Sequence, residues 1–342
     1  MTRYFIGIPQ EEFPPEDLLR HAVEAERVGF DGLSSSDHLQ PWWQGGESGH
    51  TWPWLGAAGQ ATKTIPIGTG VTSVGARYHP VLIAQAWMTL ERLFPNRVFL
   101  GLGSGEALNE VPVGDEWPSV DDQIARLEEA LEIIDRLWRG ETITQQTRFY
   151  RMRDARLHTR ADRRPPIWVS AFGPKAAHVA GRWGDGLWTL PDPDATPEVI
   201  DAFREARAQA GRGERSGDER AARGSGGEIV FQAQFSWASS DEAAFESVRK
   251  WKGAVPDEYY KGDWHEPRKM YEHGEETVSD EEFARQAIVG SDPELHVERI
   301  HELERLGPTV IVLQNRSGAD PLGAIRVYGE KVLPALRGVR VG

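Results

Sequence analysis

Short apolar segments alternate with amphipathic helical patterns along this chain, and this alternation limits its fold more than any other feature. The clearest helical pattern covers residues 120–138, where Leu127, Leu131 and Ile134 recur at helical spacing. Eight apolar segments read as strands: residues 4–8, a segment ending at 34–36, 65–71, 97–103, 166–170, 186–189, 228–237 and 309–313. The helices expected with them cover residues 16–28, 54–62, 120–138, 174–182, 196–210 (with Thr196 as its N-cap) and 321–336, with one more opening at Pro80. Such alternation predicts parallel α/β architecture, here one (β/α)8 TIM-type barrel domain over residues 1–342.

Three segments interrupt the alternation and are expected to be insertions. Residues 141–157 contain two short alternating stretches, which is typical of a β-hairpin outside the barrel. Residues 211–227 are rich in Gly, Arg, Glu and Ser and predict a mobile surface loop. Residues 254–280 are polar with several aromatics, and they occupy the place in the sequence where a lid would lie.

Composition excludes several classes of function. The chain has no cysteine, so disulfides, thiolate nucleophiles and zinc–thiolate or iron–sulfur sites are ruled out, and no metal site is predicted. Its 53 acidic and 39 basic residues give a net charge of −14, which disfavours nucleic acid and anionic membranes as partners. No apolar run approaches the ~18 residues of a membrane span. Residues 1–9 read as a first strand rather than a secretory signal, so a cytoplasmic protein is expected.

Polar residues follow the predicted strands, and the end of strand two is the most informative. Asp37 and His38 come there, followed by Trp42 and Trp43. In a β/α barrel the carboxyl ends of the strands carry the active site. Histidine can exchange a proton near neutral pH, which makes His38 a candidate acid or base. An ordinary loop histidine, with Asp37 starting a turn, fits these residues equally well.

Glycines and a carboxylate follow strand four. Gly101, Gly103 and Gly105 would let the backbone approach a ligand closely. Glu106 and Asn109 are three residues apart, so one helical turn would present both on one face. The spacing matches neither a Rossmann fingerprint nor a P-loop, and a plain turn remains the alternative.

The turn after strand five leads straight into a helix. Ala171, Phe172 and Gly173 precede Pro174, and free backbone N–H groups there, with Lys175, would suit a phosphate. A simple strand-to-helix turn fits the same residues.

Five motifs occur in order along the chain: Ser36-Asp37-His38-Leu39-Gln40-Pro41-Trp42, Arg77-Tyr78-His79-Pro80, Pro95-Asn96-Arg97-Val98-Phe99-Leu100-Gly101, Gly105-Glu106-Ala107-Leu108-Asn109-Glu110 and Ala180-Gly181-Arg182-Trp183-Gly184-Asp185-Gly186. Together they resemble the luciferase-like flavin/deazaflavin barrel superfamily, and more narrowly its branch of coenzyme F420-dependent glucose-6-phosphate dehydrogenases. The similarity extends over essentially the whole chain and is strongest from Tyr4 to Gly186.

The resemblance implies an F420-dependent dehydrogenase that moves a hydride from an alcohol carbon to C5 of the deazaflavin. His38 would take the hydroxyl proton, with Asp37 near the cofactor edge and Trp42 stabilising charge or anchoring the substrate. Glu106 would lie near N1 of the ring, and Glu11 matches a second acidic residue of the site. His38, Trp42 and Glu106 would converge on one face of the cofactor.

The same resemblance assigns further cofactor positions. Gly70 and Val71 match a non-proline cis peptide that presses a bulge against the ring. The other implied contacts are Ser73, Ser104, Gly105 and Asn109 for the cofactor, and Ala171, Phe172 and Gly173 for its phosphate.

Several positions depart from the family pattern. Leu190 and Pro193 replace the threonine and lysine that grip the substrate phosphate. Gln286 stands in place of an arginine, although Arg285 is adjacent, and Lys261 is retained as a phosphate ligand. Glucose 6-phosphate is therefore doubtful, since phosphate affinity rests on charge-assisted bonds. An unphosphorylated sugar or another secondary alcohol is the alternative, with Trp188 as part of its apolar wall.

Two other functions remain open. One is an FMN-dependent monooxygenase on the same barrel, against which Trp42 and Glu106 argue. The other is a barrel that binds a cofactor or ligand without turnover. The resemblance also implies a homodimer.

Overall fold

The computed structural model describes residues 1–211 and 226–339, and its contacts group them into two compact units. The first unit comprises Met1–Ile67 and Val230–Gly342, and the second comprises Gly68–Ile229. Of the surface loop predicted at 211–227, residues 212–225 lie outside the described residues.

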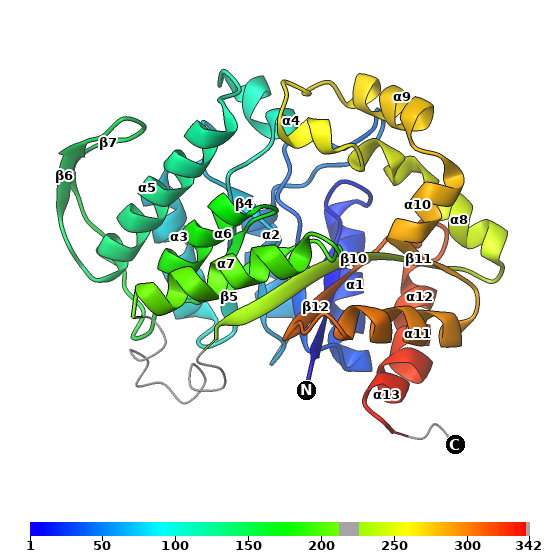
Figure 1. Ribbon diagram of the computed structural model, residues 1–342. Helices are drawn as coiled ribbons and strands as arrows, with labels where there is room; N and C mark the ends of the chain where they lie inside the picture. Colours follow the sequence, from blue (N-terminus) through cyan, green and yellow to red (C-terminus); the bar gives the residue numbers. More distant parts are fainter. Residues whose placement is uncertain (212–225, 340–342) are drawn as a thin grey trace. The chain divides into compact units, whose positions relative to one another are not determined.

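The first unit is built on parallel strands in the order β11-β10-β12-β1-β2 (Figure 1). All six residues of β12 are buried, the continuous pattern expected of a parallel strand covered on both faces. The strands are β1 (Arg3–Ile8), β2 (Gly32–Ser35), β10 (Glu228–Trp237, which begins in the second unit), β11 (Ala287–Gly290) and β12 (Val310–Asn315). The helices are α1 (Pro15–Val28), α2 (Thr51–Ala61), α8 (Asp241–Arg249), η3 (Lys250–Ala254), η4 (Asp257–Tyr260), α9 (Pro267–Thr277), α10 (Asp280–Gln286), α11 (Pro293–Glu304), α12 (Pro321–Val327), the π-helix η5 (Tyr328–Val332) and α13 (Leu333–Leu336).

The second unit has parallel strands in the order β3-β5-β8-β9, with β4 paired to β5. The antiparallel hairpin β6–β7 extends beyond α5, outside these strands, as predicted for residues 141–157 (Figure 1). The strands are β3 (Ile67–Thr69), β4 (Thr72–Ser73), β5 (Val98–Gly103), β6 (Ile143–Gln146), β7 (Arg151–Ala155), β8 (Ile167–Ser170) and β9 (Gly186–Thr189). The helices are α3 (Pro80–Leu93), α4 (Ala107–Glu110), η1 (Val111–Val113), α5 (Val120–Trp138), α6 (Pro174–Trp183) and α7 (Thr196–Gln209).

Helix α5 shows why the sequence gives these elements. Its bounds are the predicted ones, because the Ser119 hydroxyl caps the backbone N–H of Asp122 and the buried face of the helix is mostly apolar. Leu127, Ile134 and Leu137 on that face are fully buried. Burying a leucine or isoleucine side chain contributes ~1.5–3 kcal/mol, so this face holds the helix in place.

Several predicted elements need correction. The third strand is shorter than residues 65–71: β3 stops at Thr69, and pairing with β5 resumes at β4. Thr196 is not the cap of its helix but the first residue of α7, because its hydroxyl donates to the Leu190 carbonyl and accepts from the Asp192 N–H. The predicted helix 321–336 is divided by the π-helix η5. Within residues 254–280, the expected lid is largely helical, as η4 and α9.

The peptide bond between Gly70 and Val71 is cis, as the resemblance predicted. The elements that were not predicted include α8, α10, β11 and α11.

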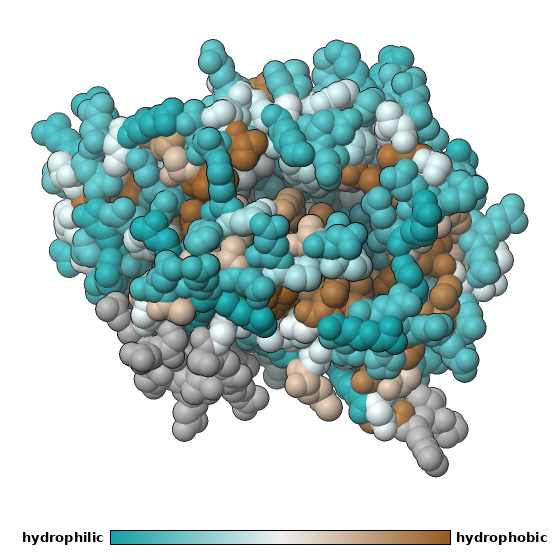
Figure 2. Space-filling model, viewed as in Figure 1, coloured by the Kyte–Doolittle hydropathy of each residue, from teal (hydrophilic) through white to brown (hydrophobic). Residues whose placement is uncertain are grey.

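The succession of strands and helices confirms the (β/α)8 TIM-type class. On the face drawn in Figure 2, hydrophilic side chains predominate, with separate apolar patches between them. Within the described ranges, every helix is too short or too polar to cross a membrane. The single-domain assignment over residues 1–342 stays a prediction.

Candidate active site

One group of the predicted site residues lies in the first unit, where β1 and β2 end. The two strands pair in parallel with Ile8 opposite Ser35, and Glu11 and His38 each follow three residues later. His38 Nε2 lies 3.6 Å from Glu11 Oε1, and only 12% of the His38 side chain is exposed. The Glu11 carboxylate is buried and also accepts the Ser36 hydroxyl. Parallel pairing therefore brings together an imidazole and a buried carboxylate.

Two tryptophans, Trp42 and Trp52, lie beside His38 and Asp37 in this group. The ring of Trp42 is buried, its centroid 5.3 Å from the His38 ring and tilted by 48°. Asp37 is also buried, and its Oδ2 accepts the indole N–H of Trp52 at 3.1 Å. The buried surroundings restrict how His38 can rotate, which suits a group that must meet a substrate proton in one orientation.

Another group of the predicted site residues lies in the second unit, around α4. The Asn109 side-chain amide donates to Glu106 Oε2 at 3.1 Å, as expected if one helical turn presents both. Glu106 is partly exposed and Asn109 is buried. Gly105 has a φ of +95°, a left-handed conformation that glycine adopts without strain.

Glu110 has a structural role that the sequence did not predict. It is fully buried, and its Oε1 accepts the Ser73 hydroxyl at 2.5 Å. Its Oε2 accepts the Arg77 backbone N–H at 3.0 Å. Glu110 thus ties the chain after β4 to α4, and it fixes the hydroxyl of one predicted cofactor contact, Ser73. Its place in the Gly105–Glu110 motif was the available signal.

The glycines of β5 allow the segment from Thr69 to Val71 to lie very close to the backbone of this strand. A Cβ on Gly101 would lie 2.0 Å from the Thr69 carbonyl oxygen, and one on Gly103 would lie 2.8 Å from a methyl carbon of Val71. Real Cβ atoms do not come so close, so neither position accepts a side chain without movement of β3 or the Gly70–Val71 bulge. Of the predicted cofactor positions, Val71 makes one of these close contacts, and Gly70 and Ser104 are next in sequence to residues that make them.

The N-terminus of α6 fits an anion. Its N-cap, Gly173, makes no side-chain capping bond, and Pro174 opens the first turn, which contains no acidic residue. Apart from Gly173 itself and its neighbours along the chain, no atom of the described residues lies within 4 Å of a Cβ built on Gly173, and Phe172 is 45% exposed. Uncapped N–H groups at a helix start bind phosphate readily. Lys175, however, pairs with Asp121 at 2.9 Å.

The predicted substrate residues lie in different surroundings. Trp188 is buried in β9, its ring centroid 6.3 Å from that of Trp168. Lys261 is exposed directly after η4, and Arg285 is exposed near the end of α10. Leu190, at a position where the family holds phosphate, is 40% exposed.

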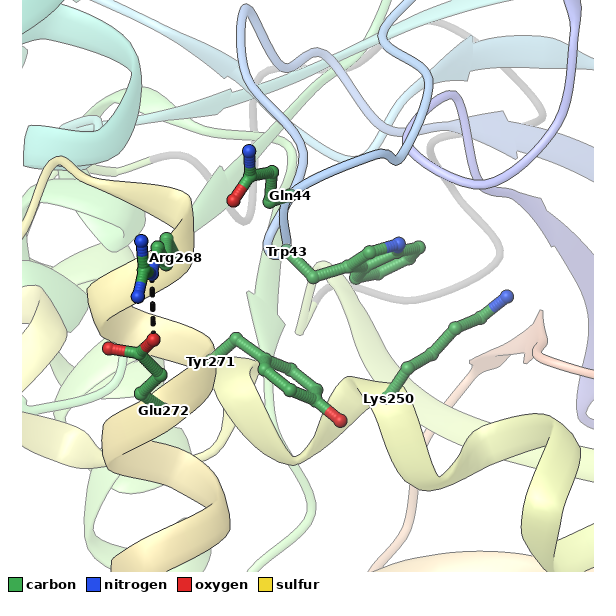
Figure 3. A pocket seen from close by; sticks show the side chains of 6 residues that line it. All are labelled: Trp43, Gln44, Lys250, Arg268, Tyr271 and Glu272. Carbon is green, nitrogen blue, oxygen red and sulfur yellow. Dashed lines mark hydrogen bonds and ion pairs between the residues drawn. The ribbon is translucent and has the colours of Figure 1, made fainter.

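A pocket of ≈ 430 Å³ lies beside α9 in the first unit (Figure 3). Trp43 and Gln44, from the loop after β2, face Lys250 and the α9 side chains. An ion pair of 2.7 Å joins Arg268 to Glu272. The lining residues are Trp43, Gln44, Lys250, Arg268, Tyr271 and Glu272, and they differ from those predicted for the site.

Buried charges next to Glu11 were also missed by the sequence. Glu12 pairs with Lys250 at 2.8 Å, and burial raises the pKa of its carboxyl. Arg316, just after β12, is 5% exposed, and its guanidinium carbon lies 3.1 Å from the Trp251 ring centroid. Strand eight was predicted to end at residue 313, but β12 continues to Asn315, so Arg316 directly follows the strand.

Comparisons with known proteins show the family to which this chain belongs. Residues 1–309 match the model of the luciferase-like monooxygenase family. An F420-dependent glucose-6-phosphate dehydrogenase of Microbacterium testaceum is 38% identical over 98% of this chain and 97% of its own length. One of Beutenbergia cavernae is 37% identical over 98% of each chain. The solved structure of an F420-dependent secondary alcohol dehydrogenase with an F420–acetone adduct superimposes with a TM-score of 0.89 and 31% identity, covering 98% of this chain and 99% of that one. The chain therefore belongs to the luciferase-like monooxygenase family and, within it, to the relatives of the F420-dependent glucose-6-phosphate dehydrogenases.

Proposed function

We propose that the protein is an F420-dependent dehydrogenase that oxidises the alcohol carbon of a sugar or another secondary alcohol. The observation that carries this proposal is the His38 imidazole held 3.6 Å from the buried carboxylate of Glu11. An alcohol loses a hydride only as its hydroxyl proton is removed, and a restrained histidine is suited to take that proton.

F420, when bound, supplies the hydride acceptor, C5 of its deazaflavin ring. His38 accepts the hydroxyl proton of the substrate, and the Glu11 carboxylate, 3.6 Å from Nε2, stabilises the imidazolium that results. Trp42, buried beside His38, excludes water from the imidazole and anchors the substrate. Asp37 holds the loop in place through its bond from the Trp52 indole.

The second unit would hold the cofactor. Glu106, oriented by Asn109, is proposed to lie near N1 of the ring. The uncapped start of α6, after Ala171, Phe172 and Gly173, is proposed to bind the cofactor phosphate. Support for the ring site comes from the close backbone approach at β5, and its proposed residues are Gly70, Val71, Ser73, Ser104 and Gly105.

The substrate is proposed to lack a phosphate group. The side chains of Leu190 and Pro193 carry no charge. The cations proposed to contact the substrate are therefore Lys261 and Arg285, which are both exposed. A dianion binds strongly only through several charge-assisted hydrogen bonds. Trp188 is proposed to provide an apolar wall.

The test is to titrate the purified protein with F420 and, separately, with FMN. Loss of the oxidised F420 absorbance is then followed with propan-2-ol, glucose and glucose 6-phosphate. We expect F420 binding, with faster turnover of an unphosphorylated alcohol than of glucose 6-phosphate. Tight FMN binding without F420 binding would favour a monooxygenase. F420 binding without turnover of any alcohol in a wider panel would favour a non-catalytic barrel.

We also propose that the protein is a cytoplasmic homodimer without a nucleic-acid partner. The net charge of −14 supports the last point, because it repels phosphate backbones. Light scattering of the purified protein and fractionation of its host cells test the other two.

A further inference from the structure

The pocket beside α9 is lined by residues that have no part in the proposed dehydrogenase reaction. Its volume of ≈ 430 Å³ lies within the range of about 300–1,000 Å³ that is usual for small-molecule sites. The ring of Trp43, the ring of Tyr271 and the alkyl chain of Lys250 lie around one space (Figure 3). All the lining residues belong to the first unit, so the pocket is contained in one compact body.

The elements that form this pocket are packed backbone against backbone. A Cβ on Gly253 of η3 would lie 3.0 Å from the Tyr271 Cα and 3.3 Å from the Trp42 carbonyl oxygen. A Cβ on Gly274 of α9 would lie 2.6 Å from the Lys252 carbonyl oxygen. These contacts hold η3 and α9 together and bring η3 close to the loop after β2. A pocket formed in this way exists before a ligand arrives, which lowers the entropy cost of binding.

The indole of Trp43 is held in one orientation. The ring of Trp251, which is buried, packs edge-to-face against it, with the ring centroids 4.8 Å apart and an angle of 74° between the planes. On the Trp43 ring also lies the Lys250 ammonium, its Nζ 5.1 Å from the ring centroid. The Tyr271 ring is partly exposed at the same pocket. Trp43 and Tyr271 thus provide two amphipathic surfaces, each with an apolar ring and a polar group.

Both cations of the pocket already have carboxylate partners. Lys250 pairs with Glu12 at 2.8 Å, and Arg268 pairs with Glu272 at 2.7 Å. A phosphate or carboxylate ligand would have to compete with these carboxylates and would be repelled by them. A hydroxyl group both donates and accepts hydrogen bonds, so it can bind beside an ion pair without displacing either member. The charges therefore favour a neutral ligand that carries several hydroxyl groups.

We propose that this pocket is a second, non-catalytic site that binds a neutral sugar ring. The apolar C–H face of the sugar packs against Trp43 and Tyr271. Its hydroxyl groups exchange hydrogen bonds with the polar side chains of the pocket, which are Gln44, Lys250, Arg268 and Glu272. The proposal does not depend on the proposed function, because none of these side chains acts on the reacting alcohol.

The test locates the sugar by fluorine NMR of protein labelled with fluorotryptophan, in the absence of F420. The resonances of Trp42 and Trp43 are assigned from Trp42→Phe and Trp43→Phe proteins. We expect glucose and methyl glucoside to shift the Trp43 resonance along a saturable curve, and glucose 6-phosphate to bind more weakly than glucose. A Trp43 resonance that does not move, or that moves only in step with that of Trp42, would overturn the proposal. Tighter binding of glucose 6-phosphate would overturn the choice of a neutral ligand.

Variants of the α9 side chains test the contacts. Tyr271→Ala should raise the Kd for glucose ~10-fold or more, because an aromatic contact is lost, and Tyr271→Phe should keep it within ~3-fold. If Tyr271→Ala folds poorly, Arg268→Ala replaces an exposed side chain and should raise the Kd ~3-fold or more. The matched control is Trp264→Ala, which lies before α9 and does not line the pocket, and it should leave the Kd within ~2-fold of wild type.

Turnover separates this pocket from the active site. Tyr271→Ala should keep kcat and KM for the fastest alcohol of the panel above within ~2-fold of wild type. Equal glucose affinities in Tyr271→Ala and Trp264→Ala would overturn the proposal, as would a KM for the alcohol that rises in parallel with the Kd for glucose. If the protein oxidises no alcohol, the proposed function fails, whereas the NMR titration still decides whether the pocket binds a sugar.

Discussion

His38 Nε2 lies 3.6 Å from Glu11 Oε1. Each of the two residues comes three positions after a residue of one facing pair, Ile8 of β1 and Ser35 of β2. The register of two parallel strands thus places the carboxylate against the imidazole. Both residues thus follow positions that the sheet itself fixes.

Replacing Glu11 by glutamine tests the carboxylate. Glutamine has nearly the same shape but no charge to stabilise an imidazolium, so kcat should fall ~10–100-fold. Because Glu11 is proposed to act on His38 rather than on the cofactor, F420 affinity should stay within ~2-fold of wild type. Steady-state kinetics and F420 titration measure the two effects. Equal losses of affinity and turnover would mean that Glu11 acts through the cofactor site.

Substitutions of Glu110 and of Glu106 by glutamine are predicted to change the free energy of unfolding by different amounts. Glu110→Gln places an amide where the buried carboxylate accepts from Ser73 and Arg77, and it should lower the free energy of unfolding by ~1–3 kcal/mol. Glu106→Gln, beside the same short helix but partly exposed, should change it by less than ~0.5 kcal/mol. Urea unfolding of both variants measures this. Equal stabilities would contradict the structural role of Glu110.

Gly173 offers a test of the cofactor-phosphate position that leaves the fold intact. An aspartate side chain at this position would cap α6 and has room to do so, but it would place a negative charge where the phosphate is proposed to bind. We expect Gly173→Asp to weaken F420 binding ~10-fold or more, with no loss of thermal stability. Gly173→Asn adds a similar cap without the charge and is the matched control. If both variants bind F420 alike, the phosphate lies elsewhere.

The burial of His21 is expected to account for part of the pH dependence of the free energy of unfolding. It is 4% exposed in α1, and burial lowers its pKa to about 4 from the usual 6.5. The unfolded chain therefore gains a proton below about pH 6.5 that the folded protein resists until about pH 4. This difference should cost about 3 kcal/mol of stability between pH 7 and pH 4.

Replacing His21 by leucine should remove that share of the loss, as measured by urea unfolding at pH 7, 5.5 and 4. The control is His178→Leu at an exposed position of α6, which should lose stability in parallel with wild type. A His21→Leu protein as sensitive to acid as wild type would show that other groups account for the dependence.

The sequence allowed local features to be predicted better than long-range contacts. The bounds of α5 follow from one periodic pattern with a capping serine, and the β6–β7 hairpin follows from alternation. The resemblance predicted the cis bond at Gly70–Val71, which no local pattern indicates. Thr196 shows the limit: a threonine before a proline is typical of a cap, yet its hydroxyl binds the preceding loop.

Arg316 could not have been identified as buried from its neighbours alone. It stands in a polar run after a strand, where an arginine is usually exposed. Its guanidinium packs against the ring of Trp251, which lies 65 residues earlier in η3. A contact between segments so far apart in the sequence is not encoded in either segment alone.

The most direct measurement of the central claim is F420 affinity and turnover in the same preparation of His38→Ala. We expect an F420 affinity within ~2-fold of wild type and a kcat lowered ~100-fold or more, because the cofactor still binds but the hydroxyl proton has no acceptor. A His38→Ala protein that oxidises the alcohol at the wild-type rate would contradict the role of His38 as the base.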